Sequence, residues 1–532
     1  MLDLRHVNQF VDNQKFKYED LKTFAELFDQ DDFFITFDLT SGYHHVDIHP
    51  EHKKYLGFHW LFPDGQTKYF IFNVLPFGLS SACYIFTKIL RPFVKKWRSE
   101  GIKSIIFIDD GICGGKGLQF VESVVMRILE DLKKAGWLVN FEKSSLTPTQ
   151  IGKWLGTIIN TRTMTFHVPK EKIDKLLRRI KLILEQTFCS AKQLSRIAGQ
   201  LAAMHLALGP IVRLFTRYIY KLIESRISWY HPITLSRGAL DELKFWLKNI
   251  NSKNGFSFKP HPTTSKMVFT DASNFGYGGF IAERLNKVIC VGKFSKSEIS
   301  TSSTARELSA VNYVLKSFGP KLANESIQIN IDNQNACHIL SVGSTKPHLQ
   351  SLALEIFFHC SKFNIFMHPT WVPREQNQIA DHYSKYNDTD DWSIDNKSFI
   401  TISKRYGPFT VDRFADNRNR KTKRFNSKFY CPETESVNCF TNDWNGENNY
   451  LCPPTNLIGS TIRHLRICNA SGTLIVPVWP SAYYWPIIFP RQIVASFVKD
   501  VFIFEPFYTS ICNDSVFKGY AKFKTMALKI KF

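Results

Sequence analysis

The chain has 532 residues, of which 44% are hydrophobic and 22% charged, and it carries a formal net charge of +21. The length allows roughly three or four domains, and the charge excess indicates a polyanionic partner, either nucleic acid or an anionic membrane surface. No apolar run approaches about 20 residues, which excludes a membrane-spanning helix. The 11 cysteines include no C-x-x-C pair, which argues against a zinc ribbon or a disulfide framework. We therefore expect an intracellular protein of the cytoplasm or nucleus, with no membrane partner.

The first hundred residues alternate strand-like and helical patterns. Residues 33–39, F-F-I-T-F-D-L, predict a strand whose end carries Asp38. Two aromatic-rich segments, 55–60 and 69–74, flank turn residues and predict a hairpin. A loop of small residues at 75–82 then opens a helix. Taken alone, Asp38 is typical of a turn residue at a strand end.

The segment 104–112, S-I-I-F-I-D-D-G-I, is the most informative stretch of the chain. Its apolar run predicts a strand buried on both faces, and the run ends in the adjacent carboxylates of Asp109 and Asp110. Gly111 is expected to give the backbone freedom for a tight turn. One interpretation is a hairpin that presents two acids to divalent metal ions, and the other is an ordinary Asp-Asp-Gly turn. Asp38 on a second strand favours the first, because two-metal phosphoryl transfer needs several carboxylates around ions roughly 4 Å apart.

Residues 161–262 are predicted to be mostly helical. Apolar residues recur at helical spacing from Ile173 to Leu184, with lysines and arginines between them, and Ser190 and Gln193 form a capping-box pattern. A basic amphipathic helix is either a solvated face over a core or a surface that follows the backbone of a nucleic-acid duplex. In this position we expect the second role.

The next part of the chain has a mixed pattern in which acids stand at strand ends and on helices. Two predicted strands end in Asp271 and Asp332, two predicted helices carry Glu307 and Asp381, and the glycine-rich run 276–279 predicts a hairpin. Each acid taken singly has an ordinary role, as a turn residue, a capping-box partner or an exposed helix acid. Four such acids in one α/β unit favour a shared site.

Five motifs resemble, in the same order, the palm motifs of reverse transcriptases: F-D-L-T-S-G-Y-H-H-V, L-P-F-G-L-S-S-A, F-I-D-D, the segment from A-G-W to Lys143, and W-L-G-T-I-I. The resemblance implies that Asp38, Asp109 and Asp110 are catalytic and hold metal ions. It implies that the ring of Tyr43 clashes with a ribose 2′-hydroxyl, and that Lys143 either protonates pyrophosphate or is a solvated turn residue. The nucleotide- and primer-binding residues that it implies are Arg5, Tyr43, Phe77, Gly78, Ile108, Lys143, Trp154 and Gly156.

Four further motifs, F-T-D-A-S, T-A-R-E-L, N-I-D-N-Q and I-A-D-H, resemble those of ribonuclease H. This resemblance implies four catalytic acids that hold two metal ions and activate water against the RNA strand of an RNA–DNA hybrid. These acids are Asp271, Glu307, Asp332 and Asp381. The loop W-V-P-R-E-Q-N lacks the histidine of cellular ribonucleases H, and Asn377 is expected to order this loop.

The last part of the chain is the least informative. The strings V-D-R-F-A-D-N-R-N, N-D-W, L-C-P-P-T and T-L-I-V-P-V-W-P resemble the adenine-methyltransferase-like segment of DIRS-type retrotransposons. The tetrad at 452–455, C-P-P-T, lacks the amide and the stacking ring of active methyltransferases, so we expect no methyl transfer. Seven cations form a cluster that either grips phosphate, the role we expect, or is a solvated loop: Arg413, Arg418, Arg420, Lys421, Lys423, Arg424 and Lys428.

The arrangement as a whole resembles the polyprotein of a DIRS-type retrotransposon, a tyrosine-recombinase element related to gypsy-like LTR retroelements. The expected fold class is a multidomain α+β and α/β chain. Its parts are partial fingers and a palm with an antiparallel sheet and helices (1–160), a helical thumb or connection (161–263), a ribonuclease H-like mixed sheet with helices (264–390), and a basic C-terminal α/β segment like a degenerate adenine methyltransferase (391–532). The family's fingers begin upstream of Met1, so we expect ribonuclease H activity to outlast polymerase activity.

The expected function is RNA-directed DNA polymerisation with ribonuclease H activity, by nucleotidyl transfer and phosphodiester hydrolysis. Each active site is expected to use two Mg²⁺ ions, with Mn²⁺ as a substitute. The expected partners are an RNA template, a DNA primer, the RNA–DNA hybrid and deoxynucleoside triphosphates, with other retroelement proteins that include a separate recombinase. Two alternatives stay open: a relic that binds nucleic acid without polymerase turnover, and a methyltransferase with a decayed polymerase.

Overall fold

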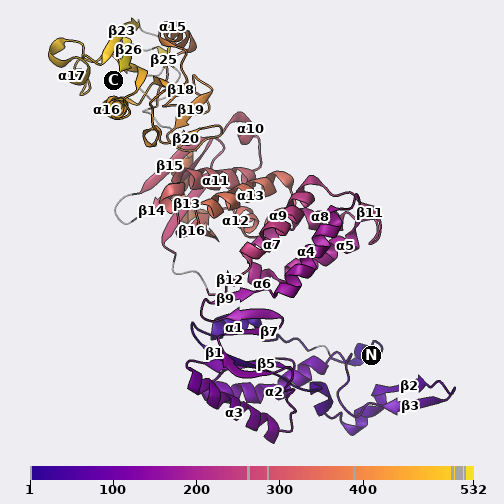
Figure 1. The fold of residues 1–532 in the computed structure, drawn as a ribbon. Coiled ribbons are helices and arrows are strands. Elements are labelled where there is room, and N and C mark those ends of the chain that lie inside the picture. Colours follow the sequence, from indigo (N-terminus) through magenta and orange to yellow (C-terminus); the bar gives the residue numbers. More distant parts are fainter. Residues whose placement is uncertain are drawn as a thin grey trace. The chain divides into compact units, whose positions relative to one another are not determined.

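A computed structural model describes residues 3–12, 14–259, 264–283, 287–386, 391–504, 508–509, 519–520 and 523–532. The chain divides into two compact units, Met1–His261 and Pro262–Phe532 (Figure 1). The domain limits expected at residues 263 and 390 lie outside the described residues. No helix in the described ranges has both the length and the apolar character needed to cross a membrane.

The first unit contains a four-stranded antiparallel sheet in the order β4-β5-β1-β6. Helices α2 and α3 contact this sheet, α2 at β4 and α3 at the other three strands. Apolar side chains between sheet and helices form the core, in which Phe37, Phe86 and Trp97 are fully buried. Burial of this face keeps the strands in register, because a shift by one residue would expose every apolar side chain. The elements are α1 (Leu21–Leu27), β1 (Phe33–Asp38), α2 (Ala82–Ser99), β4 (Lys103–Phe107), β5 (Asp110–Gly115), α3 (Leu118–Lys134) and β6 (Ser145–Thr149).

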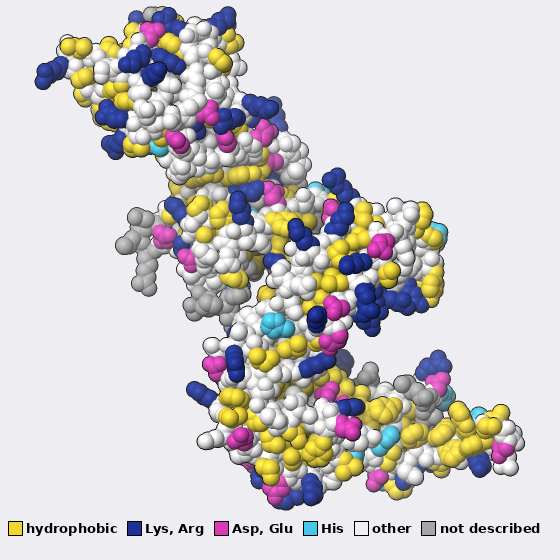
Figure 2. Space-filling view, in the orientation of Figure 1, with side chains coloured by type: hydrophobic (Ala, Val, Ile, Leu, Met, Phe, Trp, Pro, Cys, Tyr) yellow, Lys and Arg dark blue, Asp and Glu magenta, His cyan; other side chains and the backbone are white. Residues whose placement is uncertain are grey.

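A separate two-stranded sheet pairs β2 (Gly57–Leu61) with β3 (Thr67–Ile71), which confirms the expected hairpin. Both of its faces carry apolar side chains that stay exposed, among them Trp60 and Tyr69. Figure 2 shows these hydrophobic side chains gathered over the hairpin. An isolated two-stranded ribbon buries too little apolar surface to be stable alone, so the hairpin depends on its connections to the rest of the unit.

The remainder of the first unit is a second small antiparallel sheet followed by helices, close to the expected helical segment. The capping box is confirmed, because Ser190 Oγ accepts a hydrogen bond from Gln193 N and Gln193 Oε1 accepts one from Ser190 N. Helix α4 buries its apolar stripe and exposes most of its cations. The elements are β7 (Ile151–Trp154), β8 (Thr157–Asn160), β9 (Thr165–His167), α4 (Lys170–Leu184), β10 (Cys189–Ser190), α5 (Ala191–Ala203), α6 (His205–Leu208), α7 (Ile211–Leu214), α8 (Arg217–Glu224), β11 (Pro232–Ile233), α9 (Arg237–Lys253) and β12 (Phe256–Ser257).

The second unit begins with a mixed five-stranded sheet in the order β15-β14-β13-β16-β17. Strands β13, β14 and β15 are antiparallel, whereas β13, β16 and β17 run parallel. The parallel arrangement brings the carboxyl ends of β13 and β16 to the same edge of the sheet. The elements are β13 (Lys266–Ala272), β14 (Gly276–Ala282), β15 (Val288–Lys293), α10 (Lys296–Ile299), α11 (Ser303–Leu322), β16 (Ser326–Ile331), α12 (Gln334–Val342), α13 (Pro347–Lys362), β17 (Phe366–Trp371) and α14 (Gln378–Lys385).

The glycine-rich run 276–279 lies inside β14, which forms an antiparallel hairpin with β13, so the predicted hairpin is confirmed; the turn at residues 273–275 precedes the run. A Cβ atom on Gly278 would lie 2.3 Å from the backbone nitrogen of Ser384 in α14. A Cβ atom on the next residue, Gly279, would lie 2.6 Å from Val314 in α11. Because successive residues of a strand point to opposite faces, α14 and α11 cover the two faces of the sheet. The glycines allow both helices to approach the strand closely.

The second unit ends with a seven-stranded sheet in the order β20-β19-β18-β21-β22-β26-β23. The first five strands in this order are parallel, and β26 lies antiparallel between β22 and β23. With the other sheets, this gives the expected mixed α+β and α/β fold class. The elements are α15 (Asn396–Tyr406), β18 (Val411–Asp412), β19 (Arg424–Ser427), β20 (Ser436–Val437), β21 (Asn448–Leu451), α16 (Ile458–Ile467), β22 (Ser471–Pro477), α17 (Trp485–Ile488), β23 (Val498–Phe504), β24 (Tyr508–Thr509), β25 (Gly519–Tyr520) and β26 (Thr525–Lys531).

Candidate active sites

Three carboxylates meet at one end of the first unit's four-stranded sheet. Asp38 is the last residue of β1, and Asp110, the first residue of β5, lies directly opposite it. Directly opposed residues of antiparallel strands place their side chains on the same face. Asp109 occupies the turn between β4 and β5, and its carbonyl oxygen accepts a hydrogen bond from Leu39 N at 3.0 Å. The fold therefore brings Asp38 next to a pair of acids that lies more than 70 residues later in the sequence.

The turn that carries Asp109 differs from the expected one. Phe107 pairs with Asp110, which leaves Ile108 and Asp109 as a two-residue turn, and Ile108 has a φ of +56°. The positive φ therefore falls on Ile108, and the expectation that Gly111 provides the turn was wrong. Gly111 lies within β5, where an added Cβ atom would lie 2.1 Å from the ring of Phe37. Glycine is needed there for close packing on β1.

The acids of this group influence one another electrostatically. Burial, followed by the negative charges of Asp109 and Asp38, raises the pKa of Asp110 to about 6, although the charge of Lys143 acts to lower it. Burial also raises the pKa of Asp38, and the charge of Lys143 opposes this shift. Lys143 is exposed and close enough to act on both carboxylates. Such a site favours a bound cation, which would remove the repulsion.

Tyr43 and Phe77 lie side by side near the start of α2. The Tyr43 ring is buried, its hydroxyl lies 2.9 Å from Cys83 Sγ, and its centroid lies 4.9 Å from that of Phe77. Phe77 is 54% exposed, and Gly78 after it has a φ of +101°. Asn8 lies far from this loop in sequence but contacts it directly, because its Nδ2 donates a hydrogen bond to Gly78 O at 2.9 Å. Sequence reasoning missed Asn8, whose partner is 70 residues away and leaves no local signal.

The remaining predicted nucleotide- or primer-binding residues lie in different surroundings. Trp154 is only 3% exposed, so its ring belongs to the core. Gly156 has a φ of +71° in the turn between β7 and β8, and its carbonyl oxygen accepts a hydrogen bond from Lys172 Nζ at 2.6 Å. Arg5 is exposed and forms an ion pair with Asp3 at 2.6 Å. For contact with a nucleic acid or a nucleotide, the turn at Gly156 thus has its backbone available, and Arg5 has an accessible guanidinium.

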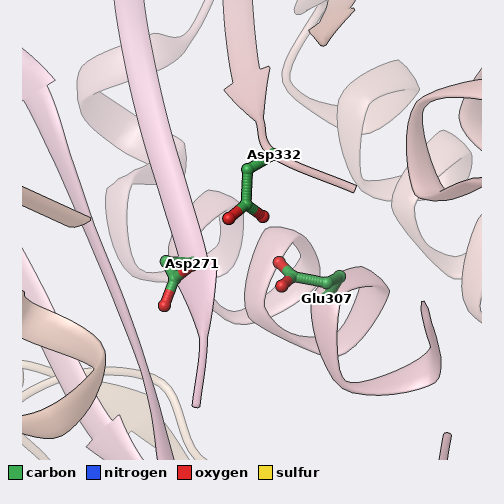
Figure 3. A group of neighbouring side chains, drawn as sticks. All are labelled: Asp271, Glu307 and Asp332. Atoms are coloured by element: carbon green, nitrogen blue, oxygen red, sulfur yellow. The ribbon is translucent and has the colours of Figure 1, made fainter. Parts of the chain in front are cut away.

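The second unit groups three acids more tightly, at the shared carboxyl edge of β13 and β16. Asp271 lies in β13, Asp332 directly follows β16, and Glu307 lies in the first turns of α11. Each offers one carboxylate oxygen, and the three oxygens all lie within 4.8 Å of one another (Figure 3). Among the described residues, no other group of three or more acids, histidines or cysteines brings its ligand atoms within 4.8 Å of one another. Glu307 is not a capping-box partner, because Ser302 caps α11 through Ala305 N.

Burial and mutual repulsion dominate the electrostatics of this cluster. Burial, with the charges of Asp271 and Asp332, raises the pKa of Glu307 well above its usual range. Burial also raises the pKa of Asp271 to about 6 and raises that of Asp332. The Oε2 atom of Glu307 is buried without a hydrogen-bond partner. The three carboxylates supply hard oxygen donors, and one of these oxygens lacks a hydrogen-bond partner. This donor set fits a divalent ion such as Mg²⁺.

Asp381, the fourth expected acid, lies near this cluster but outside the 4.8 Å group. Its carboxylate accepts hydrogen bonds from Lys385 Nζ at 2.6 Å and from Arg374 Nη2 at 3.2 Å. Burial acts to raise the pKa of Asp381, but these two cations outweigh it and lower the pKa. Sequence reasoning did not assign Arg374 or Lys385 to the site. The spacing of Lys385, four residues after Asp381 on one helix, was the available signal.

Asn377 orders the loop before α14, as expected. Its side chain is 1% exposed, and Nδ2 donates to the carbonyl oxygen of Thr270 at 2.9 Å. Thr270 precedes Asp271 in β13, so this hydrogen bond ties the loop to the strand that carries the acid cluster.

Four arginines of the C-terminal basic cluster are engaged within the chain, so they do not supply the phosphate binding that was expected of the whole cluster. Arg418 pairs with Asp416, Arg420 with Glu433, and Arg424 with Glu435 and Glu447. Arg413 is 4% exposed, and its guanidinium donates to the side-chain oxygens of Asn449 and Asn426. These cations hold the loops of the seven-stranded sheet together.

Two regions of the chain match known families. Residues 1–159 match the family described as reverse transcriptase (RNA-dependent DNA polymerase). Residues 261–357 match the RNase H-like domain found in reverse transcriptase. These regions contain the two acid groups described above, with the exception of Asp381.

Several curated proteins are similar over a longer part of the chain. The retrovirus-related Pol polyprotein from transposon opus of Drosophila melanogaster is 23% identical over 401 residues, which cover 71% of this chain and 38% of that polyprotein. The enzymatic polyprotein of figwort mosaic virus (strain DxS) is 23% identical over 348 residues, which cover 64% of this chain and 49% of the viral protein. The chain thus spans less than two thirds of the length of these two relatives.

Solved structures of low overall similarity include the foamy viral protease-reverse transcriptase dRH in complex with double-stranded DNA. It is 16% identical with a TM-score of 0.43, and the match covers 69% of this chain and 62% of that one. The family matches and the curated relatives together show that the chain carries a reverse transcriptase domain and a ribonuclease H-like domain, homologous to those of retrotransposon and pararetrovirus polyproteins.

Proposed function

We propose that the chain copies RNA into DNA at the palm acids and hydrolyses the RNA strand of an RNA–DNA hybrid at the second acid cluster. The observation that carries this proposal is the convergence of Asp271, Glu307 and Asp332 within 4.8 Å in a region that matches ribonuclease H. Carboxylates this close repel one another unless a cation lies between them.

In the palm, Asp38 and Asp110 are the proposed metal ligands on opposed strands, with Asp109 beside them in the turn. Two Mg²⁺ ions in each active site, or Mn²⁺ in their place, would activate the attacking oxygen and stabilise the charge on the leaving group. The electrostatic effect of Lys143 on Asp38 and Asp110 supports the proposal that its ammonium gives a proton to pyrophosphate. Ile108, at the turn, is proposed to contact the primer end.

The incoming deoxynucleoside triphosphate is proposed to lie against Tyr43, Phe77 and Gly78. The contact of the Tyr43 hydroxyl with Cys83 and the packing of its ring on Phe77 support the proposal that this ring is held in place to clash with a ribose 2′-hydroxyl. The turn at Gly156 is proposed to approach the primer through its backbone. Arg5 is proposed to contact the triphosphate once it exchanges Asp3 for phosphate oxygens.

In the second cluster, Glu307 and Asp332 face each other and Asp271 lies beside them (Figure 3). We propose that these three acids hold the metal ions, and that Asp381 joins them when the hybrid binds. The phosphates of the hybrid would compete for Arg374 and Lys385, which now neutralise Asp381. The two cations would then hold the substrate backbone while the freed carboxylate completes the site.

The element of origin is proposed to be a DIRS-type retrotransposon, related to gypsy-like elements and dependent on a separate recombinase. The order of the seven-stranded sheet, parallel except for β26, supports a methyltransferase-like ancestry of residues 391–532. Cys452 in the C-P-P-T tetrad is 3% exposed and offers a buried thiol where an active enzyme needs an amide. We therefore expect no methyl transfer from this part of the chain.

The test is a single reaction with an RNA template, a DNA primer, Mg²⁺ and deoxynucleotides, in which primer extension and RNA cleavage are both followed. Asp109→Asn/Asp110→Asn is expected to abolish extension and leave cleavage intact, and Glu307→Gln is expected to do the reverse. If the unmodified chain binds the hybrid but neither extends nor cleaves, the proposal is wrong and the chain is a nucleic-acid binder without turnover.

A further inference from the structure

The C-terminal sheet changes the direction of its chain progression at β18. From β18 the chain moves to β19 and then β20 on one side, and it returns to β21 on the other side of β18. In open parallel sheets, the carboxyl ends of the two strands at such a switch point form the usual crevice for a ligand. The strands in question are short, but their order and direction define this point without ambiguity.

A cavity of about 510 Å³ lies over these carboxyl ends. The residues that follow β18, β19, β20 and β21 line it, for example Ala415, Phe429, Asn438 and Pro454. The ribonuclease H-like part of the same unit closes it with β15 and α11. This volume falls within the range of about 300–1,000 Å³ that is typical of small-ligand sites. The position of the cavity and its size both indicate a site for a small ligand.

The lining combines aromatic rings with an excess of positive charge. Phe414, Phe429 and Phe440 are half-buried and line the cavity, so their rings can stack on a planar base. The charged groups that line it are Lys293, Lys321, Arg413, Arg418, Lys428, Asp391 and Asp416. Arg418 pairs with Asp416, and Arg413 donates to two amide oxygens, which leaves three lysines against Asp391. This excess of positive charge favours an anionic ligand such as phosphate.

The loop after β18 is built to hold one shape. Asp412 is 2% exposed, and its carboxylate accepts hydrogen bonds from Lys421 N at 3.0 Å and from Phe414 N at 3.3 Å. The sequence from Asp412 to Lys421 contains no glycine, so the backbone cannot approach a phosphate as closely as a glycine-rich loop does. Phosphate recognition in this cavity would therefore rely on side chains, above all lysines on both walls.

We propose that this cavity binds a nucleoside phosphate, with the base against the phenylalanine rings and the phosphate toward Lys321 and Lys428. The binding requires no divalent metal, because cationic side chains supply the charge. It is separate from both acid clusters and independent of their proposed activities.

The test is isothermal titration of the full chain in EDTA with dATP, dAMP, adenosine and S-adenosylmethionine in turn. EDTA removes the metal ions through which the palm acids would hold a triphosphate. We expect one site that binds dATP and dAMP, with adenosine at least tenfold weaker because it lacks phosphate. Absence of binding by either phosphate, or binding of S-adenosylmethionine that dATP does not compete with, would overturn the proposal.

Charge-reversal variants locate the site. Lys321→Glu/Lys428→Glu is expected to weaken dATP binding at least tenfold, whereas the matched exposed pair Lys362→Glu/Lys397→Glu, outside the cavity, is expected to leave it within twofold. Equal weakening by both pairs, or loss of binding in Asp38→Asn/Asp110→Asn alone, would contradict the assignment. Hydrogen exchange on the unmodified chain adds a readout that needs no variant: dATP should slow exchange within residues 413–421, and unchanged exchange there would count against the proposal.

Discussion

At the scale of single residues, burial determines the pKa values of the acids in the two clusters more than their neighbours in sequence do. Glu307 and Asp271 owe their raised pKa values first to desolvation and then to the negative charges of neighbouring acids, which are Asp271 and Asp332 for Glu307, and Asp332 and Asp381 for Asp271. The pKa of Asp381 is lowered instead, because the charges and hydrogen bonds of Lys385 and Arg374 outweigh the effect of burial. The cluster therefore contains buried carboxyl groups whose raised pKa values favour a bound cation, and beside them one carboxylate that is already paired with cations.

Glu307→Gln is expected to separate activity from stability. Loss of one ligand should lower the rate of RNA cleavage at least 100-fold, because an amide cannot replace a carboxylate as a metal ligand of full charge. In EDTA the variant should melt roughly 1–3 °C higher, because it removes a buried like charge. Cleavage assays and calorimetry measure both effects. The exposed control Glu283→Gln should change neither, and a Glu307→Gln variant that cleaves normally would remove this residue from the site.

Lys143→Ala is expected to shift the pH dependence of nucleotidyl transfer. Metal ligation needs ionised carboxylates, so at subsaturating Mg²⁺ the rate should rise as the pH passes the pKa of Asp110, about 6 in the metal-free site. The charge of Lys143 lowers the pKa of Asp110 and Asp38, so its removal raises both and moves the midpoint to higher pH. A pH–rate profile measures the shift, with the exposed Lys133→Ala as the control. A midpoint that moves to lower pH would show that the sign is wrong.

At the scale of elements, close packing decides where the strands and helices place these residues. Gly111 allows the ring of Phe37 to lie against β5, and Gly278 and Gly279 allow helices to approach both faces of β14. Helix α8 depends on a different device, a buried carboxylate. Glu242 in α9 is 3% exposed and accepts hydrogen bonds from Tyr218 N at 3.0 Å and Ile219 N at 2.9 Å.

Gly111→Ala is expected to destabilise the first unit by about 1–3 kcal/mol, because its Cβ atom would overlap the buried ring of Phe37. Gly199→Ala is the matched control, since that glycine lies in α5 with no atom within 4 Å of an added Cβ. The control should stabilise the unit by about 0.5–1 kcal/mol through helix propensity. Urea unfolding followed by tryptophan fluorescence measures both changes. Equal effects of the two substitutions would mean that the ring moves aside.

Glu242 is expected to make the stability of the first unit depend on pH. Burial raises its pKa from 4.5 to about 7, despite the backbone hydrogen bonds that act to lower it. The folded state therefore binds the proton more tightly than the unfolded chain does. Stability from this group should be complete below about pH 4.5 and should decline as the pH rises through 7, by at most about 3 kcal/mol. Hydrogen exchange of the α8 amides between pH 4.5 and 8 should show the decline in the unmodified chain and a smaller one in Glu242→Gln; identical slopes would assign it to another group.

At the scale of the whole molecule, the net charge of +21 is distributed unequally between solvated and internally paired cations. Helix α4 exposes Lys175 and Arg178, whereas Arg418, Arg420 and Arg424, between the end of β18 and the start of β19, pair with acids. Affinity for nucleic acid should therefore depend on the first unit more than on the C-terminal sheet. Exposed cations that contact phosphates release counterions, so their contribution is visible in the salt dependence.

Lys175→Glu/Arg178→Glu is expected to weaken binding of an RNA–DNA hybrid at least tenfold at low salt. The slope of log affinity against log salt concentration should fall by about 1 for each phosphate contact that is lost. Fluorescence anisotropy over a salt series measures both quantities. The double variant Lys362→Glu/Lys397→Glu, with the same change in charge, should keep the slope of the unmodified chain. An equal loss in this control would indicate a general effect of net charge.

The sequence alone predicted those features that depend on neighbouring residues. The capping box at Ser190, the hairpin between β2 and β3, the mixed fold class and the presence of acids at the ends of β1, β13 and β16 all follow from local pattern. Motif order was sufficient to indicate reverse transcriptase and ribonuclease H-like domains, which the family matches then showed. Local pattern failed at Gly111, which allows the ring of Phe37 to pack closely and does not form the turn. At the run 276–279 the local pattern predicted the hairpin, but it did not predict that the glycines admit helices on both faces.

Only the tertiary structure decided which side chains meet. Asn8 holds the loop at Gly78, and Arg374 and Lys385 neutralise Asp381. Arg413, Arg420 and Arg424 likewise pair with acids or amides of other loops, which removes these three arginines from the predicted phosphate-binding cluster. The cavity at the switch point needs the order of seven strands and the approach of α11. Such features depend on distances between residues remote in sequence, and residue types alone do not specify them, because the same side chain can be solvated, paired or buried according to what folds against it.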